Sequence, residues 1–162
     1  MEVNARHVYQ ASVDKVFRSF GTEADVIAKH ESLGARNVEF DYCYLKEASL
    51  DLKVHREVPA EAPAMLKKFM AEWNEVYQTE NWTGTPGERY QGDFEVHLKG
   101  VPVKILGRCV LTQDGDHTVN QVSVKIDCGI PLVGKKLEAF VAESCEASME
   151  KEYQFIKGLV EA

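Results

Sequence analysis

The alternation of hydrophobic and polar residues changes its period several times along the chain, and each change predicts a new element. Residues 2–9 read as a strand, and hydrophobic residues then recur at helical spacing from Val13 to Phe20. Ser12 precedes this run, and its hydroxyl can accept a hydrogen bond from a free N–H of the first turn. The pattern therefore predicts a first helix that begins after Ser12 and a second short helix over residues 23–32.

From Ala35 onward the period becomes two, which is typical of strands with one face toward a core and one toward water. A turn near Lys46 separates two such runs. On this alternation Cys43 faces water, as do Glu39 and Asp41. The residues expected to face the core are Val38, Phe40, Tyr42 and Tyr44 in the first run and Leu50, Leu52 and Val54 in the second.

The second half of the chain reads as a run of strands followed by one long helix. Pro59 and Pro63 interrupt the pattern, and residues 64–70 suggest a short helix or turn. Strands are predicted over about 75–83, 88–98, 101–112 and 117–128, with hairpin turns at Gly100 and Gly115, where glycine supplies a positive φ. Pro131 suits a helix start, and no strong breaker follows for roughly 28–30 residues. This order predicts an α+β fold with an antiparallel sheet.

Composition narrows the class of protein. The chain has 162 residues and a formal net charge of −7, which fits one domain over residues 1–162 and argues against nucleic acid or anionic membrane surfaces as partners. The N-terminal segment has no apolar secretory region, and no apolar run reaches the roughly 18 residues of a membrane span. We therefore expect a cytoplasmic protein without membrane insertion, whose four cysteines are free thiols. The oligomeric state is left open.

Signatures of common chemistry are missing from the sequence. There is no nucleophile elbow, no phosphate-binding loop and no dinucleotide fingerprint. The histidines lack metal-binding spacing, so neither a metal nor another cofactor is expected. By strand parity His55 and His97 face water, and His7 lies on the core face beside Tyr9. Glutamates of the long helix, among them Glu152, read as its solvated face.

Four segments carry a resemblance to a known superfamily. The segment from Ala11 to Phe17 resembles the entry into the first helix of the START-like (SRPBCC) superfamily, whose members have the helix-grip fold. Segments 81–84, 100–103 and 129–138 are similar to an uncharacterised bacterial family of unknown function within it. The resemblance implies a curved antiparallel sheet wrapped around a long C-terminal helix, with two short helices after the first strand. It also implies a cavity for lipids, quinones or polyketides.

The long helix supports a cavity independently. Its ends carry bulky residues, whereas its middle is small at Ala142, Ser144, Cys145, Ala147 and Ser148. A helix held at both ends but slender at its centre would leave a void against a concave sheet, and persistent voids are usually occupied. The alternative is that the small residues let the sheet approach the helix. The resemblance favours the cavity.

Parity also sends polar residues inward. Arg56 follows Leu52 and Val54 at even spacing, and Glu80 and Gln78 precede Trp82 in the same way. A buried charge needs a partner. Arg56 could pair with Glu80, hold the polar head of a ligand, or lie at the rim of the sheet in water.

The sequence thus favours a protein that binds or carries a hydrophobic small molecule over an enzyme. A cyclase or dehydratase acting in the same cavity is the first alternative, with Arg56, Glu80 and Tyr90 as its candidate groups, and a co-chaperone-like protein-interaction domain is the second. The candidate ligand-binding residues are Phe40, Tyr42, Leu52, Val54, Arg56, Glu80, Trp82, Tyr90, Phe94, Ile105, Val124, Val141, Cys145 and Met149.

Overall fold

The computed structural model describes residues 1–59, 67–68 and 71–162, and its order of elements is the one predicted. The short helix or turn predicted over 64–70 lies outside the described residues except for a turn at 67–68. The elements are β1 (Glu2–Tyr9), α1 (Val13–Gly21), α2 (Glu23–Ser32), β2 (Arg36–Leu45), β3 (Ser49–Pro59), β4 (Trp73–Thr85), β5 (Arg89–Leu98), β6 (Val103–Asp114), β7 (His117–Cys128) and α3 (Gly134–Val160).

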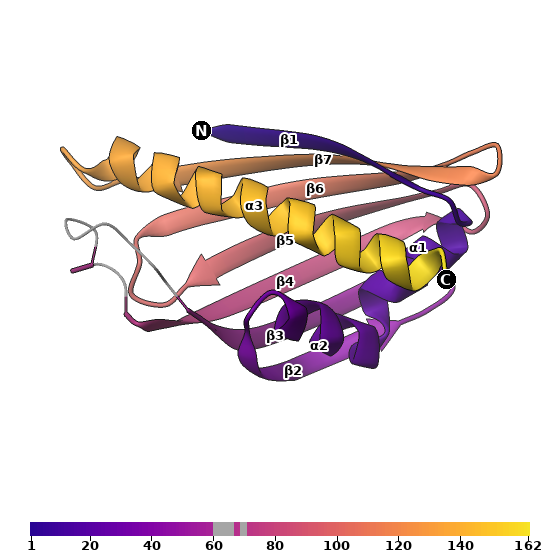
Figure 1. Cartoon of the computed structure of the whole chain (residues 1–162), viewed down its shortest axis with the longest axis horizontal. Coiled ribbons are helices and arrows are strands. Elements are labelled where there is room, and N and C mark those ends of the chain that lie inside the picture. The colour runs from indigo at the N-terminus through magenta and orange to yellow at the C-terminus, as the bar shows by residue number, and fades with distance from the viewer. Residues whose placement is uncertain (60–66, 69–70) are drawn as a thin grey trace.

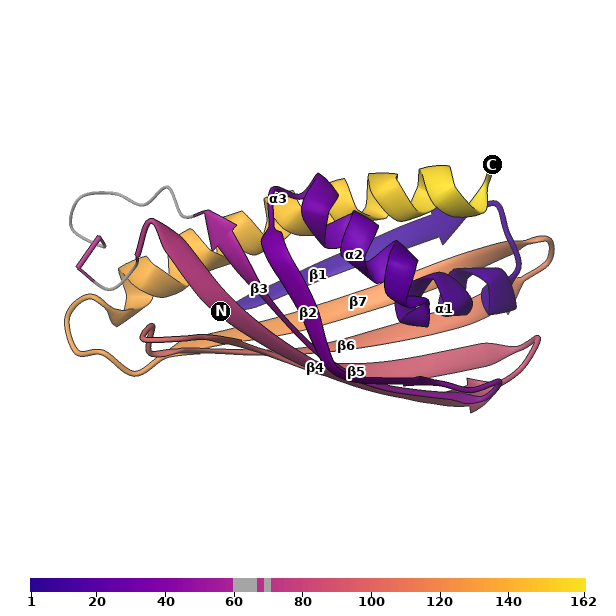
Figure 2. The same cartoon turned by 90° about the horizontal axis from the view of Figure 1, so that it is seen from below.

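The seven strands form one antiparallel sheet in the order β1-β7-β6-β5-β4-β3-β2. The sheet is curved, and α3 runs along its concave side (Figure 1). The two short helices lie on that same side, with α1 between the sheet and the C-terminal part of α3 (Figure 2). The predicted α+β architecture, a sheet that grips one long helix, is confirmed.

Helix α1 is positioned by local sequence signals. The Ser12 hydroxyl accepts a hydrogen bond from the Lys15 amide at 3.2 Å, as predicted for an N-cap. At the other end, Gly21 lies so close to β3 that an added Cβ would be 2.8 Å from a methyl carbon of Leu50. The missing side chain therefore lets α1 pack directly on the sheet.

The hairpin glycines behave as predicted. Gly100 between β5 and β6 has a φ of +76°, and Gly115 between β6 and β7 has a φ of +62°. Both values lie in the left-handed region, which glycine adopts without steric cost. The two turns bring β5, β6 and β7 into the register that places Phe94 opposite Gly107.

Helix α3 begins at Gly134 and not at Pro131, so the predicted helix start is wrong by three residues. Leu132 adopts a φ of 72°, which a helix cannot contain. The chain therefore turns once more after Pro131 before the helix starts. Gly134 fits there because an added Cβ would lie 2.9 Å from the carbonyl oxygen of Cys128.

The predicted facing of residues in β2 is wrong beyond Phe40. The register between β2 and β3 shifts between Phe40 and Tyr42, which places an extra residue in β2 and reverses the alternation. Tyr42 and Tyr44 consequently lie on the outer face, where their rings stack 5.8 Å apart. Cys43 faces inward instead, and its thiol donates a hydrogen bond to the carbonyl of Gly21 at 3.3 Å.

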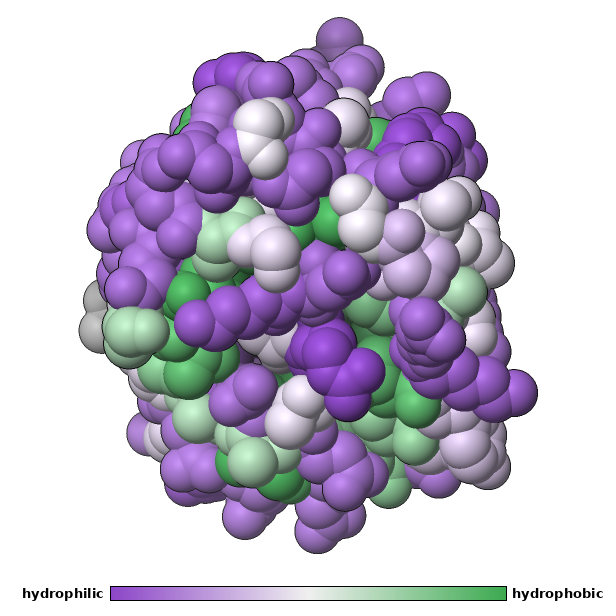
Figure 3. All heavy atoms as spheres, turned by 90° about the vertical axis from the view of Figure 1, so that its right-hand side faces the viewer, coloured by the Kyte–Doolittle hydropathy of each residue, from purple (hydrophilic) through white to green (hydrophobic). Residues whose placement is uncertain are grey.

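The buried hydrophobic residues fall into two clusters. The packed cluster surrounds α1 and the C-terminal end of α3, and the cavity cluster lies between the N-terminal half of α3 and strands β5–β7 and β1. The cavity cluster contains Val3, Val101, Val103, Ile105, Val122, Val124, Ile126, Leu137, Val141 and Ala142. Polar side chains cover most of the molecule's face at the α1 end, and hydrophobic side chains show only between them (Figure 3). The packed cluster contains Tyr9, Val13, Val16, Phe17, Phe20, Leu50, Leu52, Val54, Trp82, Tyr90, Leu111, Ile156 and Val160.

Within residues 1–59, 67–68 and 71–162, no helix is both long and apolar enough to cross a membrane.

Candidate functional site

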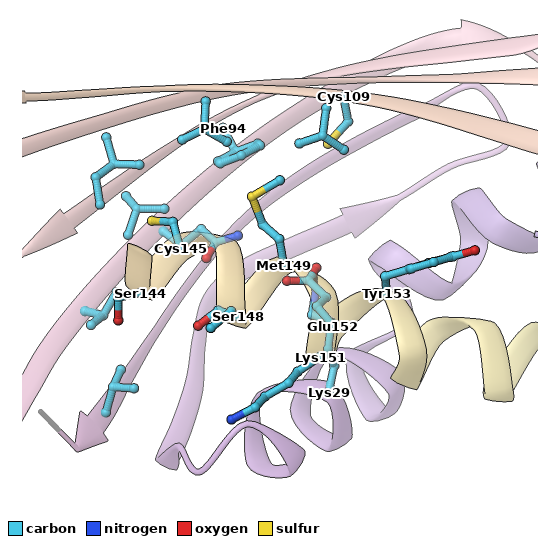
Figure 4. A pocket seen from close by; sticks show the side chains of 18 of the residues that line it. Lys29, Phe94, Cys109, Ser144, Cys145, Ser148, Met149, Lys151, Glu152 and Tyr153 are labelled. Carbon is cyan, nitrogen blue, oxygen red and sulfur yellow. Dashed lines mark ion pairs between the residues drawn. The ribbon is translucent and has the colours of Figure 1, made fainter. Parts of the chain in front are cut away.

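A cavity of about 710 Å³ lies between α3 and the concave face of the sheet. Cys145 and Met149 point into it from α3, and Phe94 and Cys109 lie opposite on the sheet (Figure 4). Cavities of roughly 300–1,000 Å³ are typical of small-molecule sites. The space is therefore large enough for a ligand well beyond the size of water.

The slender middle of α3 borders this cavity, as its composition predicted. Ser144, Cys145, Ala147 and Ser148 all line the space, and three of them, Ser144, Ala147 and Ser148, are also exposed to solvent. Ala142 differs because it is buried in the cavity cluster. The cavity thus opens to solvent beside the middle of α3, and the alternative that small residues bring helix and sheet into contact is wrong here.

One wall of the cavity is almost entirely hydrophobic. It is formed by β5, β6 and β7 facing the N-terminal half of α3. Gly107 allows Phe94 to lie flat on β6, since an added Cβ would be 2.0 Å from the Phe94 ring. The side chains of this hydrophobic wall are Phe94, Val96, Leu98, Ile105, Val122, Val124, Phe140, Val141 and Met149.

The remaining wall carries polar groups, and Glu80 is central to it. This side chain is buried, with 6% of its surface exposed. One carboxylate oxygen accepts a hydrogen bond from Trp82 Nε1 at 2.9 Å, and the other accepts one from Gln78 Nε2 at 2.7 Å. The inward facing of Gln78, Glu80 and Trp82 predicted by parity is therefore confirmed.

Lys29 of α2 reaches the same wall, and the sequence analysis missed it. Its ammonium group is buried and lies 3.1 Å from a carboxylate oxygen of Glu152 on α3 (Figure 4). The prediction that Glu152 belongs to a solvated helix face holds only in part, because its side chain is 37% exposed while its carboxylate compensates a buried cation. The sequence contained a signal for the burial of Lys29, because this residue follows buried Val26 by three positions and so lies on the same face of the helix.

Arg56 also lines the cavity, and the residue is partly exposed there. Its Nη1 atom is buried and has no hydrogen-bond partner among the described residues. The predicted pair with Glu80 is not formed, since the ion pairs of the described chain do not include one. Desolvation lowers the pKa of Arg56 to about 10, opposed by the charges of Glu152 and Glu80, so the guanidinium stays charged at neutral pH.

Asn120 on β7 is a second polar residue that the sequence analysis missed. Its side chain is buried and its amide interacts with the Tyr9 hydroxyl and the Cys109 thiol, but its Oδ1 atom has no hydrogen-bond donor within the described part of the chain. It lines the cavity on the face of β7 that also presents Val122 and Val124. Parity from these two valines would have identified it.

His7 is a packed core histidine, as expected from its position beside Tyr9. Its ring stacks on Tyr153 of α3 with 4.2 Å between centroids, and burial lowers its pKa. The Tyr153 hydroxyl donates a hydrogen bond to the carbonyl of Val8 at 2.7 Å. These contacts fix the C-terminal half of α3 to β1.

The thiols that face the cavity are poor nucleophiles. Burial raises the pKa of Cys145 to about 11, and burial raises that of Cys109 further. Both groups are therefore protonated at neutral pH, and the thiolate is the reactive form. Among the described residues, no group of three His, Cys, Asp or Glu side chains is arranged to hold a metal ion.

The structure brings together most of the predicted ligand-binding residues but not all. Leu52, Val54 and Tyr90 belong to the packed cluster, Phe40 packs against it, and Tyr42 lies on the outer face. Packing against α1 keeps the residues of the packed cluster out of the cavity wall, and the register shift in β2 does the same for Tyr42. The predicted residues that do line the cavity are Arg56, Glu80, Trp82, Phe94, Ile105, Val124, Val141, Cys145 and Met149.

Residues 4–160 match a family described as "Protein of unknown function (DUF2505)". The chain belongs to this family. No curated protein matches this DUF2505 chain.

Solved structures show the fold that this DUF2505 chain shares with other proteins. The structure is similar to Ara h 8.0201, with a TM-score of 0.63 and 11% identity over 99% of this chain and 97% of that one. It is similar to the ZhuI aromatase/cyclase of Streptomyces sp. R1128, with a TM-score of 0.62 and 14% identity over 99% and 93%. It is also similar to human STARD10, with a TM-score of 0.61 and 10% identity over 96% of this chain and 62% of that one. The predicted helix-grip fold is thus confirmed.

Proposed function

We propose that this protein binds an apolar small molecule in the cavity between α3 and the sheet. The observation that carries the proposal is the cavity itself, about 710 Å³ in volume, with a continuous hydrophobic wall from Phe94 to Met149. Empty space of this kind forfeits packing contacts, so a ligand that fills it stabilises the fold. A ligand that buries about 300 Å² of apolar surface gains roughly 7 kcal/mol before the costs of association.

Binding is favoured over catalysis by the separation of the candidate catalytic groups. Tyr90 is buried in the packed cluster, where its hydroxyl donates a hydrogen bond to Asp14 at 2.7 Å, so it does not join Arg56 and Glu80 at the cavity. Both oxygens of Glu80 already accept hydrogen bonds from neighbouring side chains. The cavity wall therefore suits recognition better than proton transfer.

Titration with Nile red, an uncharged apolar dye, tests the proposal. We expect saturable binding with an increase in fluorescence. In a Cys145→Trp variant the indole would occupy the cavity, and dye affinity would fall at least about tenfold. Glu146→Trp is the matched control, because Glu146 is exposed on another face of the same turn and should leave dye binding unchanged.

Failure of the unaltered protein to bind the dye or any apolar competitor would contradict the proposal. Equal binding by the Cys145→Trp variant would contradict the placement of the ligand between α3 and the sheet.

A further inference from the structure

Two polar atoms of the cavity wall lack partners, and they are of opposite kind. Arg56 Nη1 is a hydrogen-bond donor and Asn120 Oδ1 is an acceptor, and both are buried without a partner in the described part of the protein. Buried polar atoms are nearly always hydrogen-bonded, so each such exception calls for a partner. Both residues line the cavity, so a molecule inside it can supply those partners.

The two acidic side chains near Arg56 do not supply its partner. Each oxygen of Glu80 accepts a hydrogen bond from Trp82 or Gln78. Glu152 is 3.1 Å from the Lys29 ammonium, within ion-pair distance. Both carboxylates act on Arg56 through their charge but leave its Nη1 atom without an acceptor.

The charges of the cavity wall are balanced. Among the described residues that line it, three carry a positive charge and three carry a negative charge. His7 adds no charge at neutral pH, because burial lowers its pKa. An anionic ligand would therefore give this wall a net negative charge, which is costly for the part of the ligand that is removed from water. The charged lining residues are Lys29, Arg56 and Lys151, and Glu80, Glu143 and Glu152.

We infer that the cavity takes an uncharged molecule with an apolar body, a carbonyl or ether oxygen that accepts from Arg56, and a hydroxyl that donates to Asn120. This inference rests on the proposed function and specifies the chemistry of its ligand. A long-chain carboxylate satisfies Arg56 but carries the excess charge, and a hydrocarbon leaves both atoms unpaired. The site therefore selects hydroxylated ketones or esters over fatty acid anions.

A series of flexible probes with the same chain length tests this selectivity, because a flexible chain adapts to the spacing of the two groups. Methyl 12-hydroxydodecanoate carries an acceptor and a donor, methyl dodecanoate carries the acceptor alone, and dodecanoate carries a charge. Each is titrated as a competitor of Nile red at pH 7.5. We expect the hydroxy ester to bind roughly tenfold more tightly than either of the others.

Two variants assign that preference to the two atoms. Arg56→Met removes the guanidinium donor and keeps an unbranched apolar stem, and Asn120→Leu removes the acceptor. Each should lower the affinity for the hydroxy ester about tenfold, with the affinity for Nile red measured separately in each variant so that the displacement data can be converted. Arg108→Met is the matched control, since Arg108 is exposed and pairs with Asp93.

The outcomes separate this inference from the proposed function. Tighter binding of dodecanoate, or equal binding of all three probes, would overturn the inference while leaving a site for apolar molecules. Unchanged hydroxy ester affinity in both variants would overturn it as well. If neither Nile red nor any probe binds the unaltered protein, the proposed function fails together with the inference.

Discussion

The two ends of the space beneath α3 are built differently. At the C-terminal end of α3, α1 lies between the long helix and the sheet, and Phe17 stacks on Tyr90 with 3.8 Å between ring centroids. At the N-terminal end no helix formed by residues 1–59 or 71–162 intervenes, and α3 faces the cavity with Cys145 and Met149. One inserted helix thus decides how far the cavity extends.

Aromatic residues have different roles in the packed cluster and in the cavity wall. Phe20 stacks on Trp82 at 5.5 Å, and these two rings close the packed cluster where it meets the cavity. Aromatic residues of the packed cluster supply stability through dense contacts. Aromatic residues of the cavity wall, such as Phe94, contact fewer protein groups and offer their faces to a ligand.

The largest effect is expected from Phe17→Ala in the packed cluster. Phe17 is fully buried, and the variant should lose about 3–5 kcal/mol of unfolding free energy because it leaves a new void. Phe140→Ala is the matched change in the cavity wall, where the side chain already borders empty space and about 1–2 kcal/mol should be lost. Urea unfolding of both variants measures the difference, and equal losses would refute the contrast.

Two glycine substitutions test whether the packed cluster tolerates an added methyl group less well than the cavity wall does. An added Cβ at Gly92 would lie 2.2 Å from the Trp82 ring, and one at Gly107 would lie 2.0 Å from the Phe94 ring. Trp82 is held by α1, so Gly92→Ala should cost about 3 kcal/mol, whereas Phe94 can move into the cavity and Gly107→Ala should cost about 1 kcal/mol. Thermal unfolding measures both. A Gly107→Ala protein as unstable as Gly92→Ala would show that Phe94 has no free space before it.

Arg56→Met is expected to stabilise the protein without ligand by about 1–3 kcal/mol. The change removes a cation whose buried Nη1 atom lacks an acceptor among the described residues and leaves an unbranched apolar side chain. Chemical unfolding of the variant and of Arg108→Met on the outer face gives the comparison. A destabilised Arg56→Met protein would mean that the charges of Glu80 and Glu152 already satisfy Arg56.

Acid should destabilise the protein through its buried histidines. Burial lowers the pKa of His7, and burial together with Arg56 and Lys29 lowers that of His30 further. Below pH 6.5 the unfolded chain binds protons that the folded chain does not, so stability present above pH 6.5 is lost as the pH falls toward the lowered values.

Each histidine contributes at most about 1.4 kcal/mol per pH unit, and we expect a loss of roughly 1–2 kcal/mol between pH 7.5 and 5.5. Unfolding free energies of the unaltered chain and of His30→Gln measure it, with His97→Gln as the exposed control. The dependence of the unfolding free energy on pH should be weaker in His30→Gln than in the unaltered chain, and unchanged in His97→Gln. The same pH dependence in His30→Gln and in the unaltered chain would contradict the buried neutral state of His30.

The sequence predicted the order of elements because their signals are local. Ser12, the turn glycines and the even spacing of Val122 and Val124 act within a few residues. The cavity was predicted from the slender middle of α3 together with the superfamily resemblance. What failed was the assignment of Leu52, Val54 and Tyr90 to the cavity, because their cover by α1 depends on tertiary packing that strand parity does not contain.

The errors in β2 and α2 have equally physical causes. A bulge after Phe40 reverses the facing of Tyr42, and nothing in the alternating pattern marks where the extra residue falls. Lys29 was overlooked because a lysine on a short helix normally reaches water, whereas here Glu152 from a distant helix compensates its burial.

Methyl NMR of methionine tests the central claim most directly, because Met149 lines the cavity and Met1 is exposed. In protein labelled with ¹³C at the methionine methyl groups, a Met149→Leu variant assigns the Met149 signal. On titration with methyl 12-hydroxydodecanoate, the Met149 methyl signal should shift and saturate together with Nile red displacement, while that of Met1 stays in place. A Met149 signal that does not move while the probe binds would show that the space between α3 and the sheet is not the binding site.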